Sequence, residues 1–393
     1  MRSYTVRDHR SHYPQTLSII NLRTSAYEKL RSHPRRAEAA VSGFLEDEPE
    51  LLRALNELDL DSPQEDRMTE DEWSAKEQSL RSLGFSEGDI ETLRRKRGPT
   101  ASGVEQTRRD VERNVLEVAK GRGILERAAL LDPTGLRDRR TVRDAAADAS
   151  TETERDALLL AVDRAALLGV AELSVTLQFP ILLASYGYTR QHRDPEKSTL
   201  RSFTTRNAYG GKTPIFAVAA DTEALVVQMS AKDVLDWLFS TGHVAEAPAS
   251  EREARLGVLE VFASGGEAAD RVRVLTHSLS HVLLRALDDG QSGFGESSLA
   301  EWLVPETLTF ALYVSSYQAY TLGAFWTLLH SRVSAWMDHA QDAIARCDND
   351  PLCHLRIPRA CERCMYLTFG CNQFNDGLSR EDLMDFVRWR AQS

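Results

Sequence analysis

Several short stretches of the chain are rich in residues that favour β-strands, and one of them, residues 172–183, also alternates between apolar and polar positions, as a strand with one buried face does. The stretches that predict strands are residues 12–22 (HYPQTLSIINL), 172–183 (ELSVTLQFPILL), 214–220 (PIFAVAA), 223–229 (EALVVQM) and 308–315. Only Asp221 and Thr222 separate the third stretch from the fourth, so these two predict a β-hairpin.

Helical spacing of apolar residues dominates the charged stretch between residues 27 and 168. Val111, Val115, Val118 and Ile124 recur there at helical intervals with charged residues between them. Ser230 is a predicted N-cap for the helix that follows it. Further helices are predicted at residues 251–264, 270–288, 324–345 and 380–390. Strands interleaved with helices predict a mixed α/β fold in the C-terminal part.

These patterns divide the chain into three predicted parts. Residues 1–26 form an extended strand segment, residues 27–168 a helical, charged domain or insertion, and residues 169–393 an α/β domain. A chain of 393 residues is long enough to bury a sizeable core in two domains. The net charge of −11 argues against nucleic-acid binding over the whole surface, although a local basic groove stays compatible with it.

The composition also bears on the cellular location. No apolar run approaches the roughly 18 residues that a membrane helix needs, so no membrane span is expected. The N-terminal sequence MRSYTVRDHRSHYPQ is polar and lacks the apolar core of a signal peptide. We therefore expect a cytoplasmic protein.

All five cysteines lie within 25 consecutive positions near the C-terminus. They are Cys347, Cys353, Cys361, Cys364 and Cys371. Two residues between Cys361 and Cys364 allow both thiolates to bind one tetrahedral metal ion, and the other three are candidates for the remaining positions. We expect a structural zinc site with Cys361, Cys364 and Cys371 plus either Cys353 or Cys347.

Three other interpretations of the cysteines are open. An iron–sulfur cluster also takes four thiolates. Disulfides are disfavoured in a reducing cytosol. The cysteines are also compatible with burial as small apolar residues that bind no metal.

Two histidines, His277 and His281, are one helical turn apart and share a helix face. This spacing suits a metalloprotease helix, but Ser278 stands where the catalytic glutamate would follow the first histidine. We therefore expect the histidines to form hydrogen bonds in the core or to orient the Gly-bearing loop 291–296, which precedes a predicted helix start. No phosphate-binding loop, nucleophile elbow or kinase motif is present in the sequence, so we expect no enzymatic activity.

A basic segment with interleaved aromatic residues follows the second predicted strand. Its cationic residues are Arg190, Arg193, Lys197, Arg201, Arg206 and Lys212. Such a segment can neutralise phosphates and stack on unpaired bases. A solvated loop is equally compatible with the sequence, and a contact with an acidic face of the helicase partner is a further interpretation.

Several of these motifs together resemble a known family. The segments that carry the resemblance are Thr276-His-Ser-Leu-Ser-His281, Ser292-Gly-Phe-Gly, the strand LTFALYVSS, Thr321-Leu-Gly-Ala and the cysteine block through Asn375, Leu378, Ser379 and Arg380. They are similar to the zinc-binding (MZB) domain of MrfA-type repair helicases. The likeness extends to DrmB-like proteins of the DISARM anti-phage system. It is carried there by three further segments, HYPQTLSI, Gly187-Tyr-Thr-Arg190 and the Glu-bearing segment 214–229.

The resemblance implies a non-catalytic subunit that binds a DrmA-like superfamily 2 helicase and engages DNA with it. A shortened relative from another defence operon fits the same residues. A zinc-ribbon regulator would need a basic recognition helix, which the charge balance does not favour. A metal-dependent hydrolase built on His277 and His281 would need an open metal position and a placed general base.

Overall fold

The computed structural model describes residues 12–22, 25–46, 70–82, 111–131, 136, 138–190, 199–203, 210, 212–287, 294, 299–315, 323–357, 359–367 and 370–393. These residues form two compact units. The first takes its described residues from 1–23, 136–251 and 265–393, and the second from 24–135 and 252–264. Residues 136–168 therefore group with the α/β part, whereas the sequence-based division placed them in the helical region.

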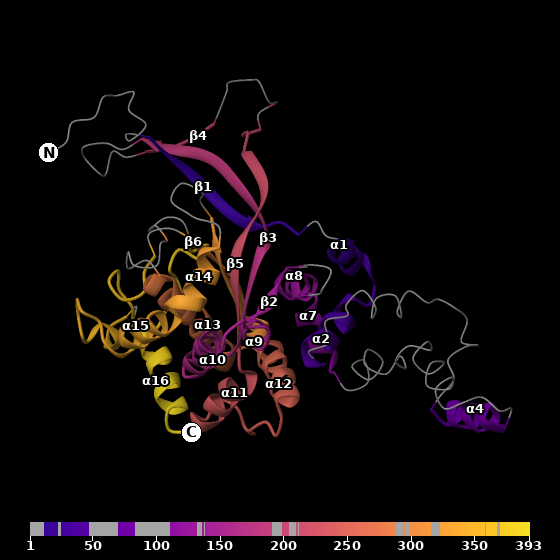
Figure 1. Cartoon of the computed structure of the whole chain (residues 1–393). Helices are drawn as coiled ribbons and strands as arrows, with labels where there is room; N and C mark the ends of the chain where they lie inside the picture. The colour runs from indigo at the N-terminus through magenta and orange to yellow at the C-terminus, as the bar shows by residue number, and fades with distance from the viewer. Residues whose placement is uncertain are drawn as a thin grey trace. The chain divides into compact units, whose positions relative to one another are not determined.

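One antiparallel sheet runs through the first unit (Figure 1). Its main path has the order β1-β3-β5-β7-β6, and β2 and β4 pair with β3 off this path. The strands are β1 (His12–Ile20), β2 (Arg140–Thr141), β3 (Val170–Arg190), β4 (Thr199–Ser202), β5 (Phe216–Met229), β6 (Leu299–Val304) and β7 (Thr309–Val314). The predicted strand at residues 12–22 is confirmed as β1.

The predicted hairpin at Asp221 and Thr222 is wrong, because β5 is one continuous strand through both residues. In the register, Asp221 pairs with Pro180 and Thr222 with Phe179 of β3. The Thr222 hydroxyl also donates a hydrogen bond of 2.9 Å to the carbonyl of Val314, so its side chain reaches the end of β7. Pairing with β3 thus outweighs the local turn propensity of Asp-Thr.

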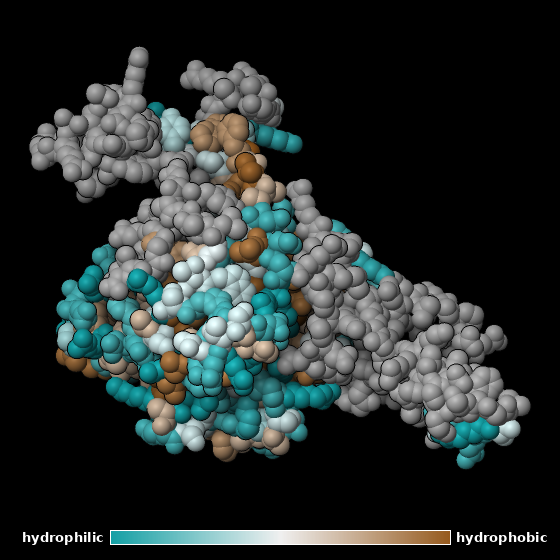
Figure 2. Space-filling view, in the orientation of Figure 1, coloured by the Kyte–Doolittle hydropathy of each residue, from teal (hydrophilic) through white to brown (hydrophobic). Residues whose placement is uncertain are grey.

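The outer half of β5 differs from its inner half in burial. Residues 224–227 are buried, whereas Phe216 and Val218, and Ile215 just before the strand, are exposed. In Figure 1 the outer parts of β1, β3 and β5 extend beyond the helices of this unit. Figure 2 shows apolar side chains gathered over this region.

Helices cover the inner part of the sheet. In this unit they are α9 (Val142–Ala147), α10 (Glu152–Ala166), α11 (Ala231–Ser240), α13 (Glu267–Leu287), α14 (Ala324–Ser331), α15 (Val333–Ala345) and α16 (Arg380–Arg390). Ser230 caps α11 as predicted, since its hydroxyl accepts a hydrogen bond from the Asp233 amide. The predicted helix 324–345 is divided at Arg332, where ψ is 6° and φ is −139°.

Helix α13 is the central helix of the first unit. Residues 275–284 are all buried, so this helix is covered on every side rather than on one face. It contacts β6, β7, α15 and α16. Strand β6 itself was not predicted, because its sequence LAEWLV contains good helix formers and followed an expected helix start. Its pairing with β7 decides its conformation.

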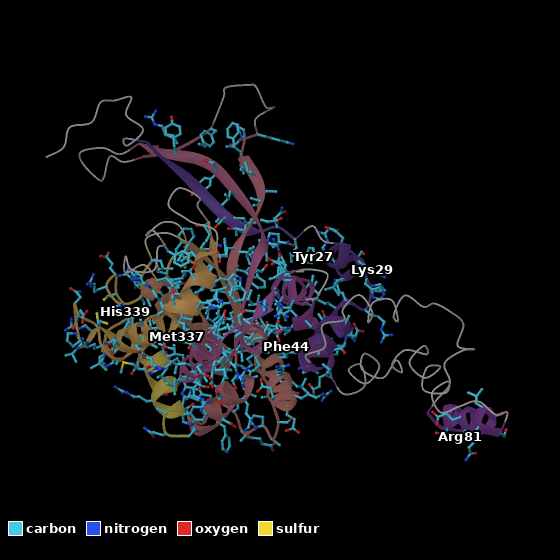
Figure 3. The ribbon with its side chains drawn as sticks, in the orientation of Figure 1. Tyr27, Lys29, Phe44, Arg81, Met337 and His339 are labelled. Atoms are coloured by element: carbon cyan, nitrogen blue, oxygen red, sulfur yellow. The ribbon has the colours of Figure 1, made fainter. Side chains whose placement is uncertain are left out.

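The second unit is helical. Its helices are α1 (Ser25–Ser32), α2 (Arg36–Glu46), α4 (Glu70–Ser82), α7 (Arg113–Ala119), α8 (Arg122–Leu131) and most of α12 (Glu251–Ser264). Phe44, labelled in Figure 3, is buried, and the guanidinium carbons of Arg127 and Arg255 lie 4.8 and 5.8 Å from its ring centre. Val115 and Ile124 are buried as their helical spacing predicts. Among the described residues, no helix combines the length and the apolar character needed to cross a bilayer.

Candidate metal centre

Four of the five cysteines come together between α15 and α16. The Sγ atoms of Cys347, Cys353, Cys361 and Cys364 all lie within 4.8 Å of one another. The Sγ–Sγ distance is 3.5 Å for Cys347 and Cys361, and 3.7 Å both for Cys353 and Cys364 and for Cys361 and Cys364. All five cysteines are free of disulfides.

These distances fit a single tetrahedral ion. Metal–sulfur bonds of about 2.3 Å place the corners of a tetrahedron about 3.8 Å apart. The observed separations of 3.5 to 3.7 Å match that value closely. A multi-iron cluster would hold its thiolates further apart, because several iron and sulfide atoms lie between them. The four cysteines can therefore hold one metal ion, and all of its coordination positions would be filled by protein sulfur.

The backbone around Cys361 and Cys364 builds half of this site. The amides of Cys364, Met365 and Tyr366 all donate to the Cys361 carbonyl, at 3.0 to 3.2 Å. This tight turn places the two sulfurs on the same side, and the Cys361 amide donates to Cys364 Sγ at 3.3 Å. Cys347 follows the end of α15, and Cys353 begins a 3-10 turn (Cys353–Leu355).

The electrostatics of the four sulfurs favour a bound cation. Burial raises the pKa of the Cys364 thiol, and negative charge on Cys353 and Cys361 raises it further. Burial alone would also raise the pKa of Cys361, but hydrogen bonds from backbone amides lower it overall. Four thiolates at these distances repel one another, so full ionisation needs a positive ion between them.

A fully buried arginine fastens the loop that carries Cys353. The guanidinium of Arg380 donates to the carbonyls of Ile344 at 3.2 Å and Pro351 at 3.0 Å. Burial raises the pKa of the Cys353 thiol, and the Arg380 charge partly offsets that rise. Arg380 therefore links helix α16 to the loop and supplies positive charge beside a thiolate-rich site.

The expectation that Cys371 joins Cys361 and Cys364 is wrong in this structure. Cys371 Sγ lies 3.4 Å from Nε2 of His277, in a second cluster with His281 and Glu301. Gly370 explains the difference, because its carbonyl accepts a hydrogen bond from the Glu301 amide at 3.1 Å and so pairs this loop with β6. The first cluster therefore contains both Cys347 and Cys353, together with Cys361 and Cys364.

The prediction that His277 and His281 form hydrogen bonds in the core is confirmed. Both side chains are buried, and each Nε2 lies 3.1 Å from Oε1 of Glu301. Burial alone would raise the pKa of Cys371, but hydrogen bonds with the two histidines lower it to about 7.

Sequence reasoning missed Glu301, whose only signal is a charged residue inside an otherwise apolar strand. Of the loop 291–296, only Phe294 lies within the described residues.

The predicted basic segment is only partly described. Arg190 ends β3, where it pairs with Thr199, and Arg201 and Lys212 are exposed. Arg193, Lys197 and Arg206 lie outside the described residues. The rings of Tyr188 and Phe203 have centroids 6.1 Å apart, and Phe203 packs edge-on against Phe216 at 5.2 Å. The role of the basic segment in nucleic-acid binding stays a prediction.

Comparison with known proteins adds no assignment to this geometry, because neither a family model nor a curated protein matches the chain.

Proposed function

We propose that the four-cysteine cluster binds one structural Zn²⁺ and that the chain is a non-catalytic, cytoplasmic partner of a superfamily 2 helicase. The observation that carries the metal assignment is the spacing of the four sulfurs, which suits the bonds that Zn²⁺ makes to thiolate. A zinc ion with four protein thiolates has no position for water, so its role is to hold the fold rather than to react.

The surface around this centre supports a protein partner. Leu352 is 52% exposed, Leu355 62% and Ile357 92%, and all three lie in the loop between Pro351 and Arg359 that the cysteines hold. Neighbouring exposed apolar side chains on a rigid support are typical of interaction sites. A bound zinc ion would keep this loop in one conformation and so lower the entropy lost on docking.

The helicase identity of the partner rests on the resemblance of the cysteine block, Asn375 and Arg380 to the helicase-associated zinc-binding domain of DrmB-like proteins. In this proposal the helicase supplies ATP hydrolysis, and the chain assists its engagement of DNA in anti-phage defence. The exposed Arg201 and Lys212 near the outer strands are the described residues through which the chain would contact DNA.

The test is co-expression of the full chain with the superfamily 2 helicase encoded nearest to it. We expect a stable complex that a Leu355→Ser/Ile357→Ser variant disrupts, while its zinc content and circular dichroism stay unchanged. The control is Leu167→Ser, which removes a 47% exposed leucine at the end of α10 and should leave the complex intact.

Two results would contradict the proposal. If the double variant binds the helicase as well as the native chain does, the exposed loop is not the docking surface. If the purified chain alone binds one DNA sequence tightly, a regulator is the better assignment.

A further inference from the structure

A second group of metal-ligating atoms lies inside the first unit, and the four-cysteine centre does not use it. His277 and His281 come from α13, Glu301 from β6 and Cys371 from the loop before α16. One donor atom from each of the four lies within 4.8 Å of the others. Three of these residues are buried, and Cys371 is half-buried.

The separations fit a single ion. A tetrahedral Zn²⁺ holds nitrogen and oxygen ligands about 3.3 Å apart, and nitrogen and sulfur ligands about 3.6 Å apart. Here each histidine Nε2 is 3.1 Å from the same carboxylate oxygen, and Cys371 Sγ is 3.4 Å from His277 Nε2. The two imidazole rings are nearly perpendicular, at 87°. The Nε2 atoms of both histidines thus lie beside the same carboxylate oxygen, within reach of one ion.

The hydrogen bonds around His281 orient it as a ligand. Its Nδ1 lies 2.9 Å from the Met365 carbonyl, which can only accept, so Nδ1 carries the proton. With no ion bound, Nε2–H donates to the Glu301 carboxylate, and a bound metal ion would replace this proton at the Nε2 lone pair. A histidine that donates one nitrogen to a carbonyl and presents the other inward has the usual arrangement of a metal ligand.

Outer contacts also hold the other ligands in place. The Ser280 hydroxyl donates to Oε2 of Glu301 at 2.5 Å, which leaves Oε1 facing the histidines. The backbone N–H of Asn375 donates to Cys371 Sγ at 3.3 Å, a contact that stabilises a thiolate. Gly370 allows the loop to lie against β6, because a Cβ at this position would come within 2.2 Å of the Leu299 carbonyl oxygen.

We propose that these four residues bind a second structural metal ion, of the class that imidazole and thiolate favour, with Zn²⁺ as the first choice. Protein atoms would fill all four positions of such an ion, so none would be open to a hydrolytic water. The ion joins α13, β6 and the loop before α16, which are far apart in sequence. This inference does not depend on the helicase partner.

The test is zinc content and X-ray absorption on the full chain dialysed against a small excess of Zn²⁺. The two centres together contain five sulfur, two nitrogen and one oxygen ligands. We therefore expect two zinc ions per chain, with an average of 2.5 sulfur and 1.5 nitrogen or oxygen neighbours for each ion. Zinc–sulfur and zinc–nitrogen bonds, at about 2.3 and 2.0 Å, are resolved by this method.

Variants separate the two centres. Cys371→Ser should reduce the content to one zinc per chain and raise the average to four sulfurs per zinc. A His277→Gln/His281→Gln variant should do the same if it folds, and Cys371→Ser keeps the test valid if it does not. The control His339→Gln removes an exposed histidine and should retain both ions.

The outcomes are distinct. One zinc with four sulfur neighbours in the native chain would overturn the second centre, and so would two zinc ions in Cys371→Ser. One zinc with a single sulfur neighbour would support this centre and refute the zinc assignment of the four-cysteine cluster instead.

Discussion

Replacing Cys353 with serine tests which cysteines share an ion. Cys353 Sγ is buried and lies 3.7 Å from Cys364 Sγ, whereas Cys371 Sγ lies beside His277. Structural zinc in small domains contributes roughly 10–16 kcal/mol of binding free energy, so an equal share for each of four sulfurs is about 2.5–4 kcal/mol. At about 1.4 kcal/mol per factor of ten, Cys353→Ser should weaken metal binding roughly 60- to 700-fold.

The assay is Co²⁺ loading followed by titration with a competing chelator. The sulfur-to-cobalt absorption of a four-thiolate site is far stronger than that of a site with one thiolate, so this band reports the four-cysteine centre. Cys371→Ser is the matched control: it should lower the total intensity only by the small contribution of the second centre's single thiolate, and it should leave the midpoint of the four-thiolate band unchanged. If Cys371→Ser weakens the band as much as Cys353→Ser does, the reasoning from the structure fails and the set inferred from spacing, with Cys371, is correct.

Two further substitutions test the surroundings of these sites. Gly370→Ala should destabilise the chain by more than about 1 kcal/mol in chemical denaturation, because φ is +91° and the added Cβ meets the Leu299 carbonyl; an unchanged midpoint would contradict the close loop packing. Glu223→Gln should cost about 1–3 kcal/mol, since the carboxylate accepts the amides of Gly323 and Phe325 at 2.9 Å and the amide NH₂ cannot replace both oxygens. Because burial raises the pKa of Glu223, native protein binds this proton more readily than unfolded protein does. Stability should therefore fall as pH rises above the unfolded pKa, and this slope should decrease in Glu223→Gln; an equal slope in both proteins would refute the assignment.

Much of the local structure could be predicted from residue order. The β-prone residues around Ser18, Ile19 and Ile20 identified β1, and a serine before the first turn identified the start of α11. The short interval between Cys361 and Cys364 predicted the turn that brings their sulfurs together. These features are determined within a few residues, where backbone geometry and side-chain period leave few alternatives.

Long-range pairing decided the rest. Cys371 is nearer to Cys364 in sequence than Cys353 is, yet the hydrogen bond between Gly370 and the Glu301 amide directs Cys371 to the histidines. Glu301 carries no motif, and it becomes a ligand candidate only because β6 packs beside α13. Likewise, Asp221-Thr222 is a turn signal until β3 supplies a partner for both residues.

The sequence by itself thus determined the kinds of ligand available and the local turns and helices that present them. Only the tertiary structure decided how the five cysteines divide between two clusters and which carboxylate completes the second. The physical reason is that a metal ion selects atoms by distance in space, to within a few tenths of an ångström. That distance is set by the docking of loops and strands from separate parts of the chain, which spacing along the chain does not encode.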